Sequence, residues 1–349
     1  MQSPVKDSLV RPGFYRLEIQ KTTWDVPVRY DSLRPVGSGA YGTVCSAIDQ
    51  KTKEKVAIKK LYRPFQSLIH AKRLTGKLRL LRHIQHEITC IPVTFWPVDV
   101  TIHFDFFNAF IFYFCLVCSY MVMPFVAQDL GHIMKKKRLT DRIIVYLFYQ
   151  LLRGLKILDF GLARQAESEM TGYVVTRWYR APEVIFNWMH YKETVDVWSA
   201  ACILAEMITG HVLFPGHDSI DQLKKIMRLT GTPDFSLVQK MQSKDAQSYV
   251  QGLPPQRKKN FREVFPNMEE KAVDLLEGML LLDPDTRLTA KQGLSHPFLA
   301  DYHDSESETD SEPYDDSFES LELAVGEWKS LIHMEIMTFD PNNPSKTAM

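Results

Sequence analysis

A glycine-rich stretch near the N-terminus has the residue types needed to bind phosphate. Residues 36–44 read Val-Gly-Ser-Gly-Ala-Tyr-Gly-Thr-Val, a GxGxxGxV pattern. Glycines let the backbone approach phosphate oxygens closely and offer them N–H donors. Alone, this pattern also fits a tight hairpin turn. Val56-Ala57-Ile58-Lys59 follows at the spacing of the next strand but one, so Lys59 can supply an ammonium group for the α- and β-phosphates of a nucleotide.

Two further motifs follow in the order typical of phosphoryl transfer. Asp159-Phe160-Gly161 offers a carboxylate that could hold Mg²⁺, and Ala181-Pro182-Glu183 closes the segment after it. Four such signatures in one order leave little room for chance. On these residues the chain resembles the protein kinases. The resemblance implies ATP and Mg²⁺ as cofactors. It also implies a two-lobed α+β fold, with a β-rich N-lobe and a helical C-lobe. The departures from the family described below predict that this fold is locally disrupted.

The segment between these motifs carries a second resemblance. Residues 170–180 read Met-Thr-Gly-Tyr-Val-Val-Thr-Arg-Trp-Tyr-Arg and resemble the dual-phosphorylation segment of mitogen-activated protein (MAP) kinases. Three other stretches, at 63–67, 123–125 and 314–318, resemble the stress-activated branch, closest to its gamma type. The resemblance spans about residues 12 to 340 except 88–118 and one junction. It implies phosphorylation at Thr171 and Tyr173, with phosphate-pairing side chains at Arg73, Arg164, Arg177 and Arg180.

The same resemblance implies the remaining site residues. Lys59 and Asp159 are the catalytic candidates, and Asp159 is the metal ligand. Glu183 and Arg287 match a buried ion pair that anchors the activation segment, a structural role on any interpretation. The ATP-binding candidates are Val36, Gly37, Ser38, Gly39, Ala40, Tyr41, Gly42, Thr43, Val44, Ala57, Lys59, Met123 at the gatekeeper position and Asp129 near the ribose, with residues 124–126 as the hinge.

The acidic stretch 301–319 has two interpretations. It reads as a solvated, mobile run of charge, or, by resemblance, as a docking patch formed by Glu312, Asp315 and Asp316. The docking interpretation implies partners with basic motifs, namely substrates and phosphatases, and upstream dual-specificity MAP kinase kinases. The family resemblance also implies proline-directed Ser/Thr phosphorylation in a stress response, in the cytoplasm and nucleus. The last residues, 346–349, have a form that a PDZ domain accepts.

One departure from the family decides how the function is interpreted. Leu155-Lys156 is followed directly by Ile157-Leu158-Asp159, and no HRDxxxxN-like string occurs anywhere in the sequence. In the family this loop carries the Asp that accepts the substrate proton, a Lys, and the Asn for a second Mg²⁺. The sequence therefore predicts a catalytic-loop deletion at 156/157. Three hypotheses remain open: an active kinase, a pseudokinase-like docking protein, and a chain that folds poorly.

Two further departures concern the N-lobe. Lys77 stands where the family has a Glu that pairs with Lys59, and two cations at close range repel. Gly76 replaces an Arg that would help to hold phosphothreonine. Residues 88–118 replace the family's sequence with unrelated, longer sequence to which no element can be assigned. Lys59 is therefore expected to lose its partner.

Composition and charge exclude several other functions. Lys+Arg and Asp+Glu both number 42, so the net charge of +0 gives no argument for a nucleic-acid or membrane partner. The five cysteines show no zinc-like spacing and are expected to be reduced thiols. The uncharged stretch 106–125 is too short to span a bilayer once its hinge-like end is set aside. The first residues do not resemble a signal peptide.

Hydrophobic periodicity predicts the elements around these motifs. Residues 1–29 are expected to be an extension, 30–122 the N-lobe, 123–300 the C-lobe and 301–349 a C-terminal extension. An antiparallel meander is predicted from strands at 33–36, 43–48 and 55–60. Helices are predicted at 68–83, 142–155 (capped by Thr140 or Asp141), 197–209, 220–229 and 271–282.

Overall fold

The computed structural model describes residues 12–39, 42–83, 94–97, 118–155, 177–185, 192–241, 243–304 and 317–337. The chain forms two compact units. The first combines Met1–Ala127 with Pro313–Met349, and the second is Gln128–Glu312. The C-terminal residues therefore belong to the same unit as the N-terminal sheet. Among the described residues, no helix is both long and apolar enough to cross a membrane.

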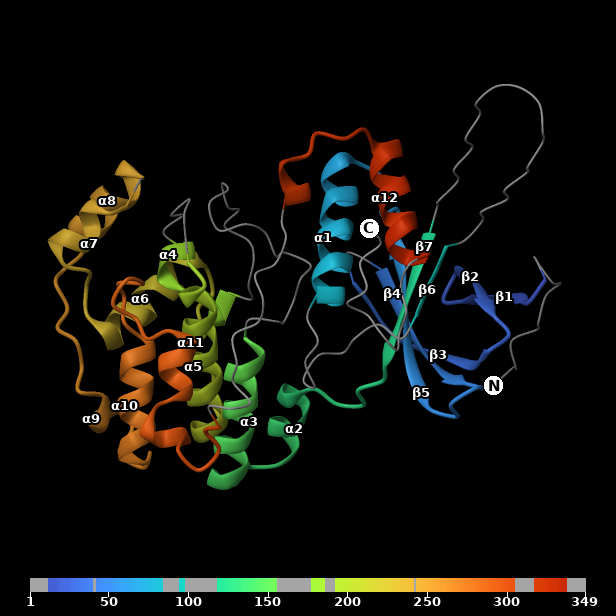
Figure 1. Ribbon diagram of the computed structural model, residues 1–349. Coiled ribbons are helices and arrows are strands. Elements are labelled where there is room, and N and C mark those ends of the chain that lie inside the picture. The colour runs from blue at the N-terminus through green and yellow to red at the C-terminus, as the bar shows by residue number, and fades with distance from the viewer. Residues whose placement is uncertain are drawn as a thin grey trace. The chain divides into compact units, whose positions relative to one another are not determined.

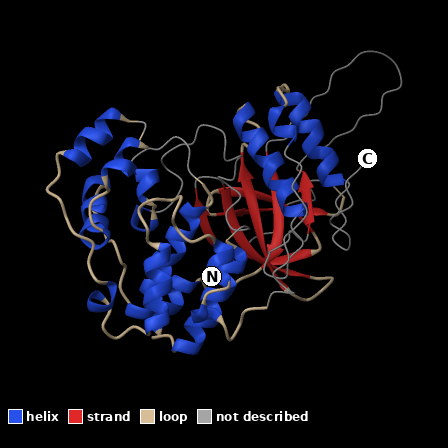
Figure 2. Ribbon diagram, turned by 60° about the vertical axis from the view of Figure 1, so that its left-hand side comes forward, coloured by secondary structure: helices blue, strands red, loops and turns tan. Residues whose placement is uncertain are grey.

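The first unit is built on antiparallel sheets (Figures 1 and 2). The predicted meander of three strands is confirmed, and two more strands extend it into a five-stranded sheet in the order β3-β4-β5-β7-β6. A separate hairpin precedes it. The strands are β1 (Phe14–Ile19), β2 (Thr22–Pro27), β3 (Tyr30–Gly39), β4 (Gly42–Asp49), β5 (Lys55–Tyr62), β6 (Thr94–Pro97) and β7 (Cys118–Pro124). β6 lies inside the stretch to which the sequence assigned no element.

Gly42 begins β4 at a point where only glycine fits. A Cβ added to it would lie 2.1 Å from the carbonyl oxygen of Lys60 on the neighbouring strand. A backbone carbonyl cannot move away without breaking the β4–β5 pairing, so any side chain there would distort the sheet. The last glycine of the phosphate-loop pattern is therefore required by the sheet itself.

The hairpin β1–β2 covers one face of the five-stranded sheet. Trp24 and Val26 are completely buried there among Cys45, Ile58 and Tyr120. The Tyr120 hydroxyl accepts a hydrogen bond from the Asp25 backbone N–H at 3.1 Å, and Lys60 donates to the Thr23 carbonyl. Burial raises the pKa of the Cys45 thiol to about 12. This thiol is free and stays protonated at neutral pH, as the sequence predicted for the cysteines.

Helices α1 (Leu68–His83) and α12 (Val325–Met337) pack side by side in the first unit (Figure 1). Leu74 and Leu78 of α1 form an apolar cluster with Met121 of β7 and Ile332 of α12. The cluster places α1 on the face of the sheet opposite the hairpin, because Met121 alternates with Tyr120 along β7. The predicted helix 68–83 is confirmed with the same bounds.

The residues before α12 also pack on α1. Phe318, in the 3₁₀ helix η3 (Ser317–Ser320), is buried with only 2% of its surface exposed, and its ring packs edge-on against Trp328. Arg79 lies over the Phe318 ring at 4.9 Å and pairs with Glu335 at 2.9 Å. A Cβ added to Gly76 would touch the same ring at 3.4 Å. The prediction of a solvated, mobile stretch is thus wrong for its last residues, because an aromatic ring anchors them.

The second unit is helical. The predicted helices within it are confirmed, although the last ends at Met279 rather than at 282. Thr140 occupies the N-cap of α3, but its side chain forms no capping hydrogen bond within the described residues. The helices are α2 (Leu130–Lys136), α3 (Asp141–Gly154), α4 (Pro182–Ile185), α5 (Thr194–Thr209), α6 (Ser219–Thr230), α7 (Phe235–Gln239), α8 (Lys244–Gln251), α9 (Phe261–Val264), α10 (Glu270–Met279) and α11 (Ala290–Leu294), with 3₁₀ turns η1 (Arg177–Tyr179) and η2 (Pro297–Leu299).

Helix α5 forms the centre of this unit. Its residues from Thr194 to Met207 are mostly buried, because apolar side chains occur all round the helix. Helices α3 and α10 pack against it, and the ring of Trp198 stacks on Phe214 at 6.0 Å. Because neighbouring helices surround α5, its position is fixed, and so are the positions of the residues at its two ends.

Truncating the buried ring of the C-terminal stretch should unfold the first unit more easily. We expect Phe318→Ala to lower the free energy of unfolding by about 3–5 kcal/mol, because it leaves a cavity beside α1. Phe235→Ala is the matched control, since that ring is 72% exposed, and it should change stability by at most about 0.5 kcal/mol. Urea denaturation followed by circular dichroism measures both. Equal losses would contradict the packing role of Phe318.

Candidate active site

The pleat of the sheet gathers the predicted nucleotide-binding side chains on one face. Val44 lies opposite Lys59 across β4 and β5, and Ala57 lies opposite Met123 across β5 and β7. Directly opposed residues share a face, and residues two apart on a strand do so as well. These four side chains therefore lie on the α1 side of the sheet, away from the hairpin.

The described part of the phosphate-loop pattern lies at the end of β3 and the start of β4. Gly37 and Gly39 are exposed at the end of β3, and no atom lies within 4 Å of a Cβ added to either. Ser38 pairs with Thr43 across the hairpin, and the register shifts between Pro35 and Gly37. The open backbone of this strand leaves room for phosphate groups. Val36 is 55% exposed beside it, and Ala40 and Tyr41 lie outside the described residues.

Lys59 projects from the middle of β5 on this nucleotide face. Within the described ranges it forms no ion pair. Its neighbour Lys60 points to the other face and donates to the Thr23 carbonyl, so the two lysines have different roles. The Lys77 side chain, predicted to stand opposite Lys59, lies outside the described residues. The expected repulsion between the two cations stays a prediction.

Asp129, the predicted ribose-side residue, lies in the second unit. It is the N-cap of α2, and its carboxylate accepts a hydrogen bond from the His132 N–H at 2.7 Å. A capping aspartate satisfies an otherwise unpaired helix N–H and is favoured by the helix dipole. Asp129 therefore has a structural role that holds whether or not it contacts a ribose.

Seven of the predicted site residues fall outside the described part of the chain. Among the residues that the structure does describe, no cluster of three His, Cys, Asp or Glu side chains could hold a metal ion. The metal ligand, both phosphorylation sites, one phosphate-pairing residue and the docking patch stay predictions. These are Asp159, Thr171, Tyr173, Arg164, Glu312, Asp315 and Asp316.

The end of the activation segment is held by the loop before α6. The guanidinium of Arg177 donates to the His217 carbonyl at 2.5 Å, and the indole N–H of Trp178 donates to the Gly216 carbonyl at 3.0 Å. Arg180 is buried beside this turn. The fourth phosphate-pairing candidate, Arg73, is exposed on α1 and makes no ion pair within the described ranges.

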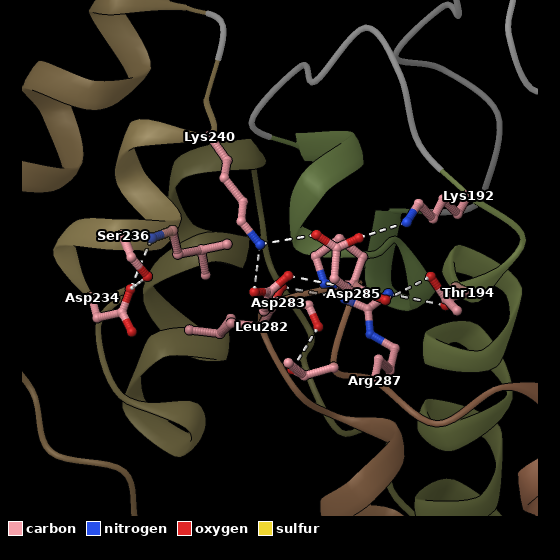
Figure 3. Close-up of polar contacts among 12 residues, drawn as sticks. Lys192, Thr194, Asp234, Ser236, Lys240, Leu282, Asp283, Asp285 and Arg287 are labelled. Carbon is pink, nitrogen blue, oxygen red and sulfur yellow. Dashed lines mark hydrogen bonds and ion pairs between the residues drawn. The ribbon is translucent and has the colours of Figure 1, made fainter.

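A buried ion pair joins Glu183 to Arg287, as the sequence predicted. The two side chains are completely buried, and two guanidinium nitrogens reach the carboxylate oxygens at 2.6 and 2.9 Å. Arg287 also donates to the Thr194 carbonyl at 2.9 Å and lies over the Trp198 ring at 5.1 Å. Figure 3 shows Arg287 reaching the start of α5. Because two guanidinium nitrogens each bond one carboxylate oxygen, the two charges compensate each other. Burying either charge alone would cost much free energy.

An exposed ion network lies beside this pair (Figure 3). Lys240 contacts Asp283 at 2.8 Å and Asp285 at 2.9 Å, and Lys192 contacts Asp285 at 2.7 Å. Hydrogen bonds from Lys192 and Lys240 lower the pKa of Asp285 to about 2. The sequence did not predict this network, because its members are far apart in the chain and no local pattern links them.

Comparisons with known proteins agree with this geometry. A protein kinase domain model matches residues 147–299. Mitogen-activated protein kinase 12 of Rattus norvegicus is 49% identical over 371 residues, covering 97% of this chain and 98% of that protein. The human protein of that name is 49% identical, with 95% and 94% covered. Mitogen-activated protein kinase 14 of Xenopus laevis is 49% identical over 94% of this chain and 95% of its own length.

The chain belongs to the mitogen-activated protein kinase family. This confirms the resemblance drawn from the glycine loop, the DFG motif and the activation segment, together with the two-lobed α+β fold. By family, the chain is a MAP-kinase-type protein serine/threonine kinase, a class that uses ATP and typically Mg²⁺.

One carboxylate of this MAP kinase is half-buried and has no ion-pair partner among the described residues. Asp196, in the first turn of α5, makes no side-chain hydrogen bond in the described chain. Burial, with a smaller contribution from Glu193, raises its pKa to about 6 from the ordinary 3.8. Unpaired carboxylates are uncommon in protein interiors because the charged form loses its hydration. The sequence did not single out Asp196, because an acidic residue in the first turn of a helix is ordinarily favourable.

Breaking the buried pair should be costly. We expect Arg287→Met to lower the free energy of unfolding by about 3–5 kcal/mol, because it leaves the Glu183 carboxylate buried without a partner. Arg262→Met is the control, since it removes an exposed ion pair with Glu270 and should cost at most about 1 kcal/mol. Urea denaturation compares the two. A loss no larger than that of the control would contradict the assigned role of the pair.

Asp196 should make stability depend on pH. Because its folded-state pKa is raised, protonated Asp196 stabilises the fold below its ordinary pKa of 3.8, and this stability is lost as the pH rises through about 6. Asp196→Asn should therefore melt higher than the original chain at neutral pH, by about 2–4 °C for each kcal/mol recovered. The difference should shrink as the pH falls through about 6.

Asp221→Asn is the matched control for this pH dependence. The pKa of Asp221 is lowered, chiefly by the His217 backbone N–H and by Lys225. Its substitution should lower the melting temperature at neutral pH and lose that effect in acid. Melting curves across the acidic range separate the two variants. An Asp196→Asn variant that melts lower at neutral pH would contradict the account of Asp196 as an uncompensated charge.

Proposed function

We propose that this MAP kinase retains its recognition surfaces but transfers phosphoryl groups at a strongly reduced rate. The observation that carries the proposal is the junction after α3. This helix ends at Gly154, and the sequence runs through Leu155-Lys156 directly into Ile157-Leu158-Asp159. No residues remain between them for the HRD-type loop of the family.

The missing loop would supply three groups that act together. Its Asp accepts the proton of the substrate hydroxyl, its Lys steadies the transferred group, and its Asn binds a second Mg²⁺. Phosphoryl transfer depends almost entirely on positioning and on stabilising charge in the transition state. We expect the loss of base and metal ligand together to reduce turnover by several orders of magnitude.

The described residues of the first unit fit an adenine nucleotide. Gly37 and Gly39 offer open backbone, and Lys59 offers an ammonium group without an ion-pair partner in the described chain. Ala57 and Met123 lie opposite one another on the same face. These residues would hold ATP, which supplies the phosphoryl group, and the resemblance assigns the Mg²⁺ to Asp159.

The regulation we propose follows the family. Upstream dual-specificity MAP kinase kinases would phosphorylate Thr171 and Tyr173, and the substrates would carry Ser or Thr before Pro. Glu312, Asp315 and Asp316 would receive basic docking motifs of substrates and phosphatases, in the cytoplasm and nucleus. The acidic composition of residues 301–319 supports this docking role. A chain that docks without catalysing would compete with active MAP kinases.

Two readouts of one assay test this function. Radiolabelled phosphate transfer to a Ser-Pro peptide, after activation by an upstream kinase, should not exceed that of an Asp159→Ala control. Added in excess to an active MAP kinase, the chain should slow substrate phosphorylation by competing for the docking motif. Asp315→Asn combined with Asp316→Asn should relieve this inhibition.

The two readouts fail in different ways. Turnover clearly above the Asp159→Ala control would show that the chain is an active kinase and would overturn the proposed impairment. Inhibition that persists unchanged in the doubly neutralised variant would leave the impairment intact and overturn the docking role of the acidic patch.

A further inference from the structure

A strongly basic segment lies in the second unit of this otherwise neutral chain. Residues 224–262 contain nine Lys or Arg and only two Asp. They run from the middle of α6 into the first residues of α9. The kinase function described above makes no use of this charge. A solvated surface can carry such charge without a function, so the positions of these cations and their ion pairs decide between the two interpretations.

The backbone holds two parts of this segment together. The extended stretch between α8 and α9 runs along the edge of the second unit (Figure 1). The Lys259 N–H donates to the Leu229 carbonyl at 2.9 Å, and the Thr232 N–H donates to the Gln256 carbonyl at 3.0 Å. A Cβ added to Gly231 would lie 2.8 Å from the Lys258 nitrogen. The extended stretch is therefore fastened to the end of α6.

Four cations from these two parts form what we call the basic ridge: Lys224, Arg228, Arg257 and Lys259. Lys224 and Arg228 lie one turn apart on the exposed side of α6. Arg257 and Lys259 are exposed on the fastened stretch beside the end of that helix. None of the four forms an ion pair within the described ranges.

Three other cations of the same segment are neutralised. Lys225 pairs with Asp221 at 3.0 Å, Lys258 with Glu277 at 2.6 Å, and Lys240 with Asp283 at 2.8 Å. Four neighbouring cations without such partners repel one another, which costs free energy in the isolated chain. An anionic partner would remove this cost and gain several charge-assisted hydrogen bonds.

We propose that the basic ridge is a docking surface for an acidic polypeptide segment. Nucleic acid fits less well, because single-stranded binding sites present exposed aromatic rings for base stacking. The rings beside the ridge, Phe261 and Phe265, are 1% and 8% exposed. A net charge of +0 also gives no long-range attraction to a nucleic-acid polymer. Closely spaced carboxylates on a flexible peptide match four cations on two adjoining backbones.

Fluorescence anisotropy with the full chain and a labelled peptide of about ten glutamates tests the docking surface. Arg228→Glu combined with Lys259→Glu should weaken binding about tenfold. Lys51→Glu combined with Lys53→Glu is the matched control, because it makes the same charge change on exposed lysines of the first unit. The control should bind the peptide as the original chain does. Binding should weaken as salt rises above ~0.15 M.

Three outcomes would overturn the proposal. The first is no measurable peptide binding at low salt. The second is an equal loss in the Lys51 and Lys53 control, which would show that binding follows net charge alone. The third is tighter binding of a DNA oligonucleotide of equal charge than of the peptide.

Discussion

The ion pair between Glu183 and Arg287 is the contact around which the described second unit is organised. A completely buried carboxylate and guanidinium are tolerated only when each satisfies the other. Arg287 also donates hydrogen bonds to two backbone carbonyls. One belongs to Thr194 at the start of α5, and the other belongs to Leu281, just after α10. The pair therefore fixes three segments at one point: α4, the beginning of α5 and the turn after α10. Trp198 packs over the guanidinium and keeps water out.

Positioning by this pair extends to the activation segment. Because Glu183 belongs to α4, the chain just before it has a fixed end, and the 3₁₀ turn at Arg177–Tyr179 is held by the loop before α6. The exposed network of Lys192, Lys240 and Asp285 adds weaker links to the same region. The C-terminal end of the activation segment, residues 177–183, is thus anchored by contacts that do not involve the catalytic loop.

In the first unit, the corresponding constraint is the alternation of side chains along β5. Val56, Ile58 and Lys60 face the hairpin, so Ala57 and Lys59 must face the side where α1 lies. A shift of register by one residue would bury Lys59 beneath the hairpin. The hairpin and the C-terminal residues therefore cover two different faces and together hold the nucleotide-binding face in place.

The sequence by itself determined the family, the order of the motifs and most elements, because glycine turns, strand alternation and helical periodicity are local properties. The meander and helix 68–83 follow from patterns visible in the chain, whereas the Glu183–Arg287 pair was implied by the family resemblance. Tertiary structure alone decided that Phe318 packs on α1, that Asp196 is half-buried without an ion-pair partner among the described residues, and that the Lys259 backbone bonds to Leu229, next to Arg228. Each depends on contacts between residues distant in sequence, and their free energies come from burial and charge that no local pattern records.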